Sequence, residues 1–221
     1  VLFGDENALV NMMETKKNRG RPTSFKRDEL IEKAMKLFWL KGFKSLSFNE
    51  IAQEVGLTRA SLYNAFSTKE NLLKECLAYY YQHLSPDGLL VDIDAQQSIG
   101  EVLHVVLDKA AELYTSASQR AGCFAVNSLN ELMAGSDDLS IEMTQMYETR
   151  RHALENVLQM AILRGELPSE FDAITNASVL LAYMGGLSIY SKSGAPLHTL
   201  KSMNRAFLLQ TGFDLVAERQ C

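Results

Sequence analysis

The segment that decides the fold runs from residue 47 to residue 73 and reads SFNEIAQEVGLTRASLYNAFSTKENLL. It holds two short helical patterns, separated by the turn at residues 56–58, and this order is typical of a helix-turn-helix. Ser47 and Glu50 form a capping box, which starts the first short helix. The second short helix is expected at residues 59–65 and is the functional centre of the motif.

The second short helix has an apolar side and a polar side. Leu57, Leu62 and Phe66 are expected to pack against the two helices before it. A helix of this size fits the major groove of DNA, and hydroxyl, amide and guanidinium groups bind phosphates and base edges. The residues left facing outward are Arg59, Ala60, Ser61, Tyr63 and Asn64.

Helix starts and a basic arm extend this predicted surface. Hydroxyl side chains, free backbone N–H groups and the positive end of the helix dipole together bind phosphate. The basic arm at residues 16–22 is expected to reach an adjacent minor groove or a phosphate, although a solvated tail remains the alternative. A second capping box, Ser67 with Glu70, is expected to open the fourth helix. The predicted DNA-binding set is Arg21, Ser47, Thr58, Arg59, Ala60, Ser61, Tyr63, Asn64, Thr68 and Lys69.

The rest of the chain is also predicted to be helical, which gives an all-α fold. With 4 Pro and 13 Gly among 221 residues, the chain has too few turn-forming residues for an all-β protein. Outside the motif, helices are expected at residues 26–41, 68–84, from 98 onward, 122–133, 138–164, 170–191 and 196–218, with a break at 85–88. Three parts follow: a flexible tail at 1–19, a helix-turn-helix DNA-binding domain at 20–67, and a helical domain at 68–221, to which the family resemblance described below assigns ligand binding, regulation and dimerisation.

Charge is divided unevenly between these parts. The chain carries −5 overall, but residues 16–84 carry +6 and residues 85–221 carry −8. A polyanionic partner is therefore expected for the first part only. The three scattered cysteines do not form a disulfide framework, so we expect a reducing, cytoplasmic setting. The longest uncharged stretch, residues 173–191, is interpreted as a buried helix and not as a membrane span.

Residues 20–80 resemble the TetR family of bacterial repressors. The resemblance implies that the helix at 59–65 reads the major groove through Arg59, Ser61, Tyr63 and Asn64, with Ser47, Tyr63 and Lys69 on phosphates. Ala60 and Ala65 depart from the commonest pattern, and Ala60 bears on base readout. The residues that carry the likeness are Phe38-Trp39, Leu46-Ser47, Ile51-Ala52, residues 55–58, Ser61-Leu62-Tyr63, Phe66 and Lys69-Glu70.

The resemblance also implies a homodimer that reads a palindromic operator on double-stranded DNA. The last two helices, about 170–191 and 196–218, would pair with their copies, and Gly185-Gly186 would permit close approach. Gly122-Cys123-x-x-x-Asn127 is similar to a signature of one branch, in which some members sense electrophiles through a cysteine. We therefore expect a ligand- or redox-responsive regulator, most simply a repressor, whose inducer the sequence does not name.

Two interpretations of the regulatory residues remain open. Cys123 is either a small buried hydrophobe or a sensing thiolate at a helix start. Methionine and aromatic residues either line a ligand cavity or pack as ordinary core. The candidate ligand-binding residues are Cys123, Phe124, Asn127, Met146, Tyr147 and Tyr183.

Other classes of function have little support in the sequence. A helical protein-interaction module without DNA binding is one alternative. A thiol enzyme is another, and it would need Cys123 to meet His104 or His152 in space. The chain has no Gly-x-Gly, Walker loop, His-Glu-x-x-His or Gly-x-Ser-x-Gly motif, and its four histidines lack metal-ligand spacing. We expect no enzyme activity, no cofactor and no metal.

Overall fold

The computed structural model describes residues 23–90, 97–116, 121–133 and 138–213, and within these ranges all regular structure is helical. The all-α prediction is therefore confirmed. The elements are α1 (Thr23–Lys41), α2 (Phe48–Glu54), α3 (Arg59–Phe66), α4 (Lys69–His83), the 3-10 helix η1 (Pro86–Leu90), α5 (Ile99–Ser116), α6 (Phe124–Leu132), α7 (Asp138–Leu163), α8 (Ala173–Lys192) and α9 (Leu197–Thr211).

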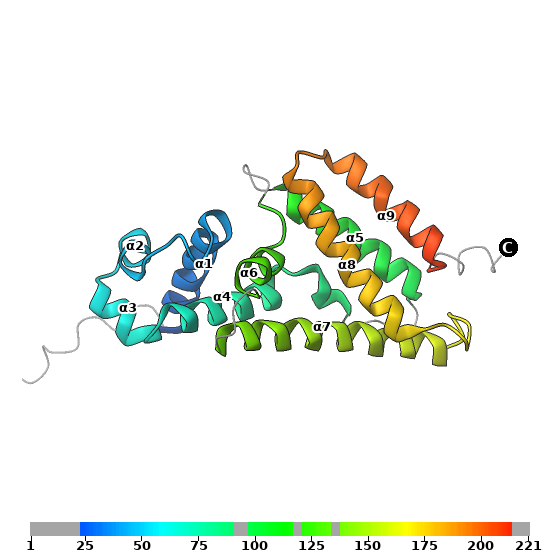
Figure 1. Ribbon diagram of the computed structural model, residues 1–221, viewed down its shortest axis with the longest axis horizontal. Helices are drawn as coiled ribbons and strands as arrows, with labels where there is room; N and C mark the ends of the chain where they lie inside the picture. Colours follow the sequence, from blue (N-terminus) through cyan, green and yellow to red (C-terminus); the bar gives the residue numbers. More distant parts are fainter. Residues whose placement is uncertain (1–22, 91–96, 117–120, 134–137, 214–221) are drawn as a thin grey trace, which may run out of the picture.

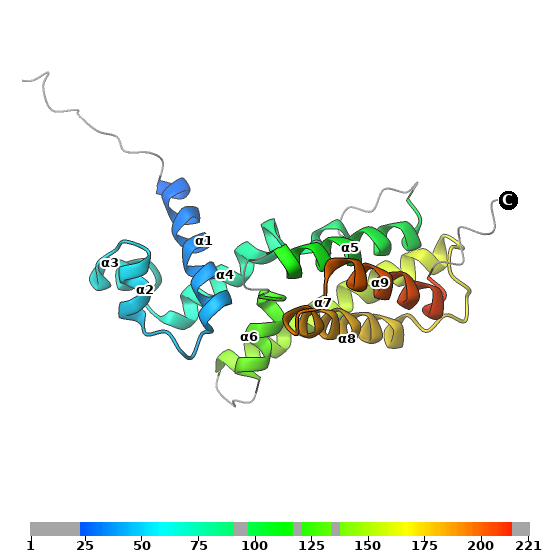
Figure 2. The ribbon, with the colours of Figure 1, turned by 90° about the horizontal axis from the view of Figure 1, so that it is seen from above.

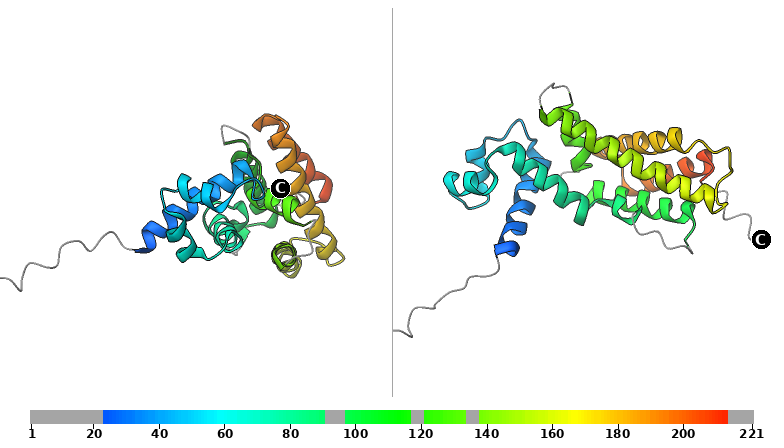
Figure 3. Two further views of the ribbon diagram at one scale, coloured as in Figure 1. Left: turned by 60° about the vertical axis from the view of Figure 1, so that its left-hand side comes forward. Right: turned by 90° about the horizontal axis from the view of Figure 1, so that it is seen from below.

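The molecule is elongated, with α1, α2 and α3 at one end and α5, α7, α8 and α9 at the other (Figure 1). We call the first group the head and, in keeping with the expectation from the sequence, helices α5–α9 the regulatory domain. Helix α4 packs on α1 and leads from the head into the regulatory domain, where α5 packs on α8 and α9, and α7 packs on α8. Helix α6 contacts α1, α4 and α7, so it joins the two ends (Figures 2 and 3).

Local sequence signals set the ends of the head helices. Gly42 follows α1 with a φ of +83°, a conformation that favours glycine. Helix α2 begins at the expected capping box of Ser47 and Glu50. The second expected capping box is wrong in register, because Thr68 and not Ser67 caps α4, while Ser67 itself has a φ of +62°.

The predicted break at residues 85–88 is present, because α4 ends at His83 and the five-residue 3-10 helix Pro86–Leu90 follows it. One further expectation needs correction. The last helix was expected to reach residue 218 but ends at Thr211, because Gly212 takes up the left-handed conformation and terminates it; residues 214–218 of the expected helix lie outside the described residues. Pro196 lies just before this helix, as its N-cap.

Helix α8 is apolar on nearly all sides. It is the one helix, in the part of the chain that the structure describes, that is long and apolar enough to cross a membrane by length and composition. One side, with Ala177, Leu180, Met184 and Leu187, is buried in the protomer. The opposite side exposes the large apolar side chains of Ile174, Val179, Ile189 and Tyr190. A helix that is hydrophobic all round normally packs on more than one side.

Candidate nucleic-acid interface

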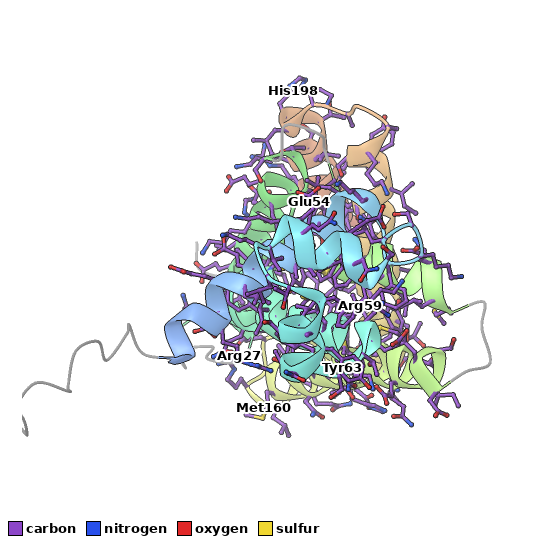
Figure 4. The ribbon with its side chains drawn as sticks, turned by 90° about the vertical axis from the view of Figure 1, so that its left-hand side faces the viewer. Arg27, Glu54, Arg59, Tyr63, Met160 and His198 are labelled. Atoms are coloured by element: carbon purple, nitrogen blue, oxygen red, sulfur yellow. The ribbon has the colours of Figure 1, made fainter. Side chains whose placement is uncertain are left out.

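The outer face of α3 presents the polar residues that the sequence singled out. Leu62 and Phe66 are buried and fix the helix against its neighbours, whereas Tyr63 is 60% exposed. Figure 4 shows Arg59 and Tyr63 at the end of the molecule that faces away from the regulatory domain. The exposed residues of this face are Arg59, Ala60, Ser61, Tyr63 and Asn64, as predicted.

The helix starts beside this face are capped by their own hydroxyl groups. Thr58 Oγ1 accepts from the backbone N–H of Ser61 at 3.1 Å and lies 2.9 Å from its Oγ. Ser47 Oγ accepts from Glu50 N at 3.2 Å, and Thr68 Oγ1 accepts from Asn71 N at 3.1 Å. These hydroxyls are exposed and act first as helix caps. Arg21, the predicted DNA-binding residue in the basic arm, lies outside the described residues.

The ammonium group of Lys69, which was expected to contact a DNA phosphate, instead binds backbone carbonyl groups of the protein. Its Nζ donates to the carbonyl oxygens of Phe43 and Leu46, each at 2.9 Å, and lies 4.1 Å from the centre of the Phe43 ring. Two of the three ammonium N–H groups are therefore used inside the protein. Lys69 fixes the turn between α1 and α2, from which Ser47 starts α2.

Arg27 fastens α3 from the opposite side. Its guanidinium donates to Glu75 at 2.6 and 3.2 Å, which ties α1 to α4. The guanidinium carbon also lies 4.4 Å from the centre of the Phe66 ring, at the end of α3. Both charged side chains are more than a third exposed, so the pair is a modest stabiliser and mainly sets the position of α3.

The head and the regulatory domain are joined at the turn between α1 and α2. Glu131, at the end of α6, accepts from the backbone N–H groups of Phe43 at 2.8 Å and Lys44 at 2.5 Å. Trp39 Nε1 donates to the carbonyl oxygens of Ala121 at 3.3 Å and Gly122 at 3.2 Å, just before α6. Displacement of α6 would therefore break or shift these hydrogen bonds to α1 and to the turn between α1 and α2. Nothing in the sequence singles out Glu131, because a lone acid in a helix is usually solvated.

The candidate ligand-binding residues do not share one cavity. Phe124 is buried against Trp39 and Tyr80. Asn127 fixes the segment that precedes α6, because its side-chain Nδ2 donates to the carbonyl oxygen of Ala121 at 2.7 Å. Tyr183 stacks on Phe207, with ring centres 3.9 Å apart, and donates to Asn204 between α8 and α9. Met146 and Tyr147 line a narrow cavity between α4, α6 and α7.

Cys123 is the N-cap of α6 and is 3% exposed. Its backbone N–H donates to Ser188 Oγ at 2.8 Å, and its thiol lies 3.3 Å from the Tyr80 hydroxyl. Burial, together with the nearby Cys123, raises the pKa of Tyr80 well above its usual value. These contacts favour the core interpretation of Cys123 over that of an accessible thiol. Cys76 is fully buried, and burial raises the pKa of its thiol.

The sequence profile of bacterial regulatory proteins of the tetR family matches residues 30–76, and that of the tetracyclin repressor-like C-terminal domain matches residues 101–205. The chain is 30% identical over 185 residues to the HTH-type transcriptional repressor ComR of Escherichia coli strain K12, over 84% of this chain and 88% of the relative. The chain belongs to the TetR family. It is a DNA-binding transcriptional regulator and not an enzyme, as the sequence predicted.

Two other similar proteins show comparable coverage. The HTH-type transcriptional repressor BdcR of the same E. coli strain is 28% identical over 193 residues, which are 86% of this chain and 91% of the relative. The TetR family transcriptional regulator CifR, solved as a cysteine double mutant with a 26-base-pair operator DNA, superposes with a TM-score of 0.72 at 25% identity. The superposition covers 84% of this chain and 97% of CifR.

Proposed function

We propose that this TetR-family member is a repressor that binds a palindromic operator as a homodimer and leaves it when a small molecule binds the regulatory domain. The observation that carries the proposal is the outer face of α3, where Arg59, Ser61, Tyr63 and Asn64 are exposed above buried Leu62 and Phe66. In this arrangement the guanidinium, hydroxyl and amide groups point toward a groove or a phosphate.

The similar proteins support repression and operator binding. ComR and BdcR are named as transcriptional repressors, and the CifR structure contains operator DNA. Two copies of the head, related by a twofold axis, would read two half-sites one helical turn apart. We also infer a cytoplasmic location, in keeping with a DNA-binding regulator of this family.

The exposed side of α8 supports dimerisation through α8 and α9. It displays Ile174, Val179, Ile189 and Tyr190 to solvent in the single chain. A Cβ atom added at Gly185 or Gly186 would meet nothing within 4 Å, which leaves room for close approach of a second helix. Burying this apolar face against a second copy would stabilise the pair.

DNA contact is tested by an electrophoretic mobility shift with the DNA upstream of the protein's own gene, repeated across salt concentrations. Arg59→Ala and Tyr63→Ala are expected to weaken binding because each removes a group from the α3 face. If Arg59 contacts a phosphate, its loss lowers the slope of log K against log salt by about 0.9 per protomer. Lys109→Ala is the matched control, because it removes an exposed cation from α5, outside both the head and the proposed α8–α9 interface.

The outcomes separate the proposal from its main alternative. Weaker binding in both α3 variants, with the control unchanged, supports the assigned face. Equal shifts for all variants would contradict it. A wild-type protein that shifts no upstream DNA at any salt concentration would instead favour a helical module that binds another protein.

A further inference from the structure

Helix α6 lies between the head and helix α8 (Figures 1 and 2). One peptide group at its start, between Gly122 and Cys123, is bound on both sides. Its carbonyl oxygen accepts from Trp39 Nε1 of α1 at 3.2 Å, and its N–H donates to Ser188 Oγ of α8 at 2.8 Å. A trans peptide group is planar and rigid, and its C=O and N–H point in opposite directions. A shift of Ser188 would therefore move the acceptor that holds Trp39.

A second path of hydrogen bonds joins the same two helices. The carbonyl oxygen of Ala121 accepts from Trp39 Nε1 at 3.3 Å and from Asn127 Nδ2 at 2.7 Å. Asn127 Oδ1 accepts from Lys192 Nζ of α8 at 3.1 Å. A lysine ammonium only donates and a carbonyl oxygen only accepts, so these two partners fix the orientation of the Asn127 amide. Both paths thus end on the indole of Trp39 at one side and on α8 at the other.

Helix α8 approaches the start of α6 very closely. A Cβ atom on Gly122 would lie 2.7 Å from Ser188 Oγ and 3.0 Å from Lys192 Cδ. Ser188 is fully buried and Cys123 nearly so, and a hydrogen bond that is shielded from water is stronger than one on a surface. The start of α6 therefore has no room to move toward α8.

Helix α8 also carries the proposed dimer contact, on its other side. Ser188 faces the interior of the protomer, whereas the next two residues, Ile189 and Tyr190, are exposed. In a dimer formed through this face, α8 is the reference to which each head is attached. The two bridges to Trp39 would therefore set the position of each head relative to the twofold axis.

We propose that Ser188 and Lys192 are positioning residues for operator binding, which hold the head at a fixed angle to α8 and thereby set the distance between the two heads of the dimer. This inference rests on the proposed dimeric repressor and assigns a role in reading half-site spacing to two residues of the regulatory domain. They act through Trp39 and α1 and not by contact with DNA. Without the bridges the head stays folded but takes up a wider range of orientations, and ordering it on the operator weakens binding.

The test uses the full-length protein and its operator, mapped by footprinting within the DNA upstream of its gene. Ser188→Ala removes an acceptor, and Lys192→Met removes a donor while keeping an apolar stem. Each is expected to weaken operator binding in the mobility shift about 5- to 50-fold, which corresponds to one hydrogen bond in each of two protomers.

Each variant has a matched control. Ser191→Ala removes an equally buried hydroxyl from α8, but this hydroxyl donates to the Ser188 carbonyl within the same helix. Lys109→Met removes an exposed cation from α5, so it measures the effect of charge alone. Both controls should bind the operator as the wild type does.

The preference for half-site spacing separates positioning from a general loss of stability. One base pair inserted at or removed from the operator centre changes the separation of the half-sites by about 3.4 Å and rotates one of them by about 35°. The wild type should lose affinity steeply on this change. Ser188→Ala and Lys192→Met should lose less, because their heads are less constrained, whereas a variant that is merely less stable would keep the wild-type preference.

A double-mutant cycle tests the path itself. Trp39→Phe removes the indole N–H, so Ser188→Ala should cause at most about a twofold further loss of operator affinity once it is present. Trp39→Phe and Ser191→Ala should instead have additive effects. If circular dichroism shows that Trp39→Phe does not fold, the cycle of Asn127→Ala with Lys192→Met tests the second path in the same way.

The proposal is supported if Ser188→Ala and Lys192→Met both weaken operator binding, relax the spacing preference and remain dimers in sedimentation velocity. Wild-type affinity in either variant, an unchanged spacing preference, or additive losses in the cycle overturns it. Dissociation of the variants into monomers also overturns it, because the loss of binding would then follow from assembly. If Ser188→Ala does not fold, the exposed Lys192 decides through Lys192→Met.

The failure of this inference is distinguishable from failure of the proposed function. If the wild type binds its operator as a dimer and both variants do so equally well, only the positioning role is wrong. If the wild type binds no upstream DNA, the repressor proposal fails, and the positioning role fails with it.

Discussion

Replacement of Glu131 by glutamine tests whether α6 holds the head through a charged hydrogen-bonding group. The carboxylate accepts from Phe43 N and Lys44 N, so both of its oxygens are occupied. Glutamine keeps the shape but offers one oxygen and one NH2 group, which would face a backbone donor. One charge-assisted hydrogen bond, worth about 1.5–3 kcal/mol, is lost, and the other becomes neutral, at a cost of about 1 kcal/mol.

Water restores part of this loss at Lys44, because that residue is exposed. We therefore expect Glu131→Gln to lower the free energy of unfolding by about 2–3 kcal/mol. Urea unfolding followed by circular dichroism measures the change, at one fixed protein concentration because a dimer's stability depends on concentration.

The matched control for this experiment is Glu32→Gln. Glu32 pairs with Lys36 four residues along the exposed side of α1, so its loss should cost no more than about 0.5 kcal/mol. Equal stability of Glu131→Gln and the wild type would refute the reasoning, because it would mean that the two N–H groups gain nothing from the negative charge.

Three further substitutions test other parts of the structure. Lys69→Met should lower stability and weaken operator binding without changing the salt slope, because Lys69 braces a turn; a lower slope in the salt titration would show that it contacts a phosphate instead. Ile189→Glu should convert the dimer into a monomer in sedimentation velocity, and an unchanged dimer would rule out this face of α8. Hydrogen bonds from Thr175 lower the pKa of Asp172, so the ionised Asp172 cap stabilises the fold at neutral pH. This stabilisation is lost as the pH falls through the lowered pKa. Asp172→Asn, which caps without titrating, should lose less stability than the wild type between pH 7 and pH 3 in urea unfolding, and parallel losses would contradict this.

The head could be predicted from the sequence because its signals are local. The capping box of Ser47 and Glu50, the turn at residues 56–58 and the burial of Leu62 and Phe66 all follow from residue type and helical spacing. The same spacing placed Tyr63 and Asn64 outside. Helix ends followed less directly from the sequence. Ser67 and Thr68 are adjacent and either could cap α4, whereas α9 ends at Thr211 because Gly212 adopts the left-handed conformation.

The contacts between distant segments could not be predicted in this way. Lys69 reaches carbonyl oxygens that lie 23 and 26 residues away in the chain, and Glu131 reaches N–H groups 87 and 88 residues away. Periodicity tells which side of a helix is buried but not which neighbour covers it. For this reason Arg150 and Arg151 look alike in the sequence, whereas in the structure Arg150 lines the narrow cavity between α4, α6 and α7 and Arg151 does not.

The position of Trp39 gives the protein a built-in optical probe. It is the only tryptophan in the chain, and its indole N–H is held by two carbonyl groups at the junction of α1 and α6, beside Tyr80 and Phe124. Separation of the head from α6 would break these hydrogen bonds and admit water to the ring. A red shift of the intrinsic emission, with stronger quenching by iodide, would then report in real time, without any label, that the two ends of the molecule have come apart.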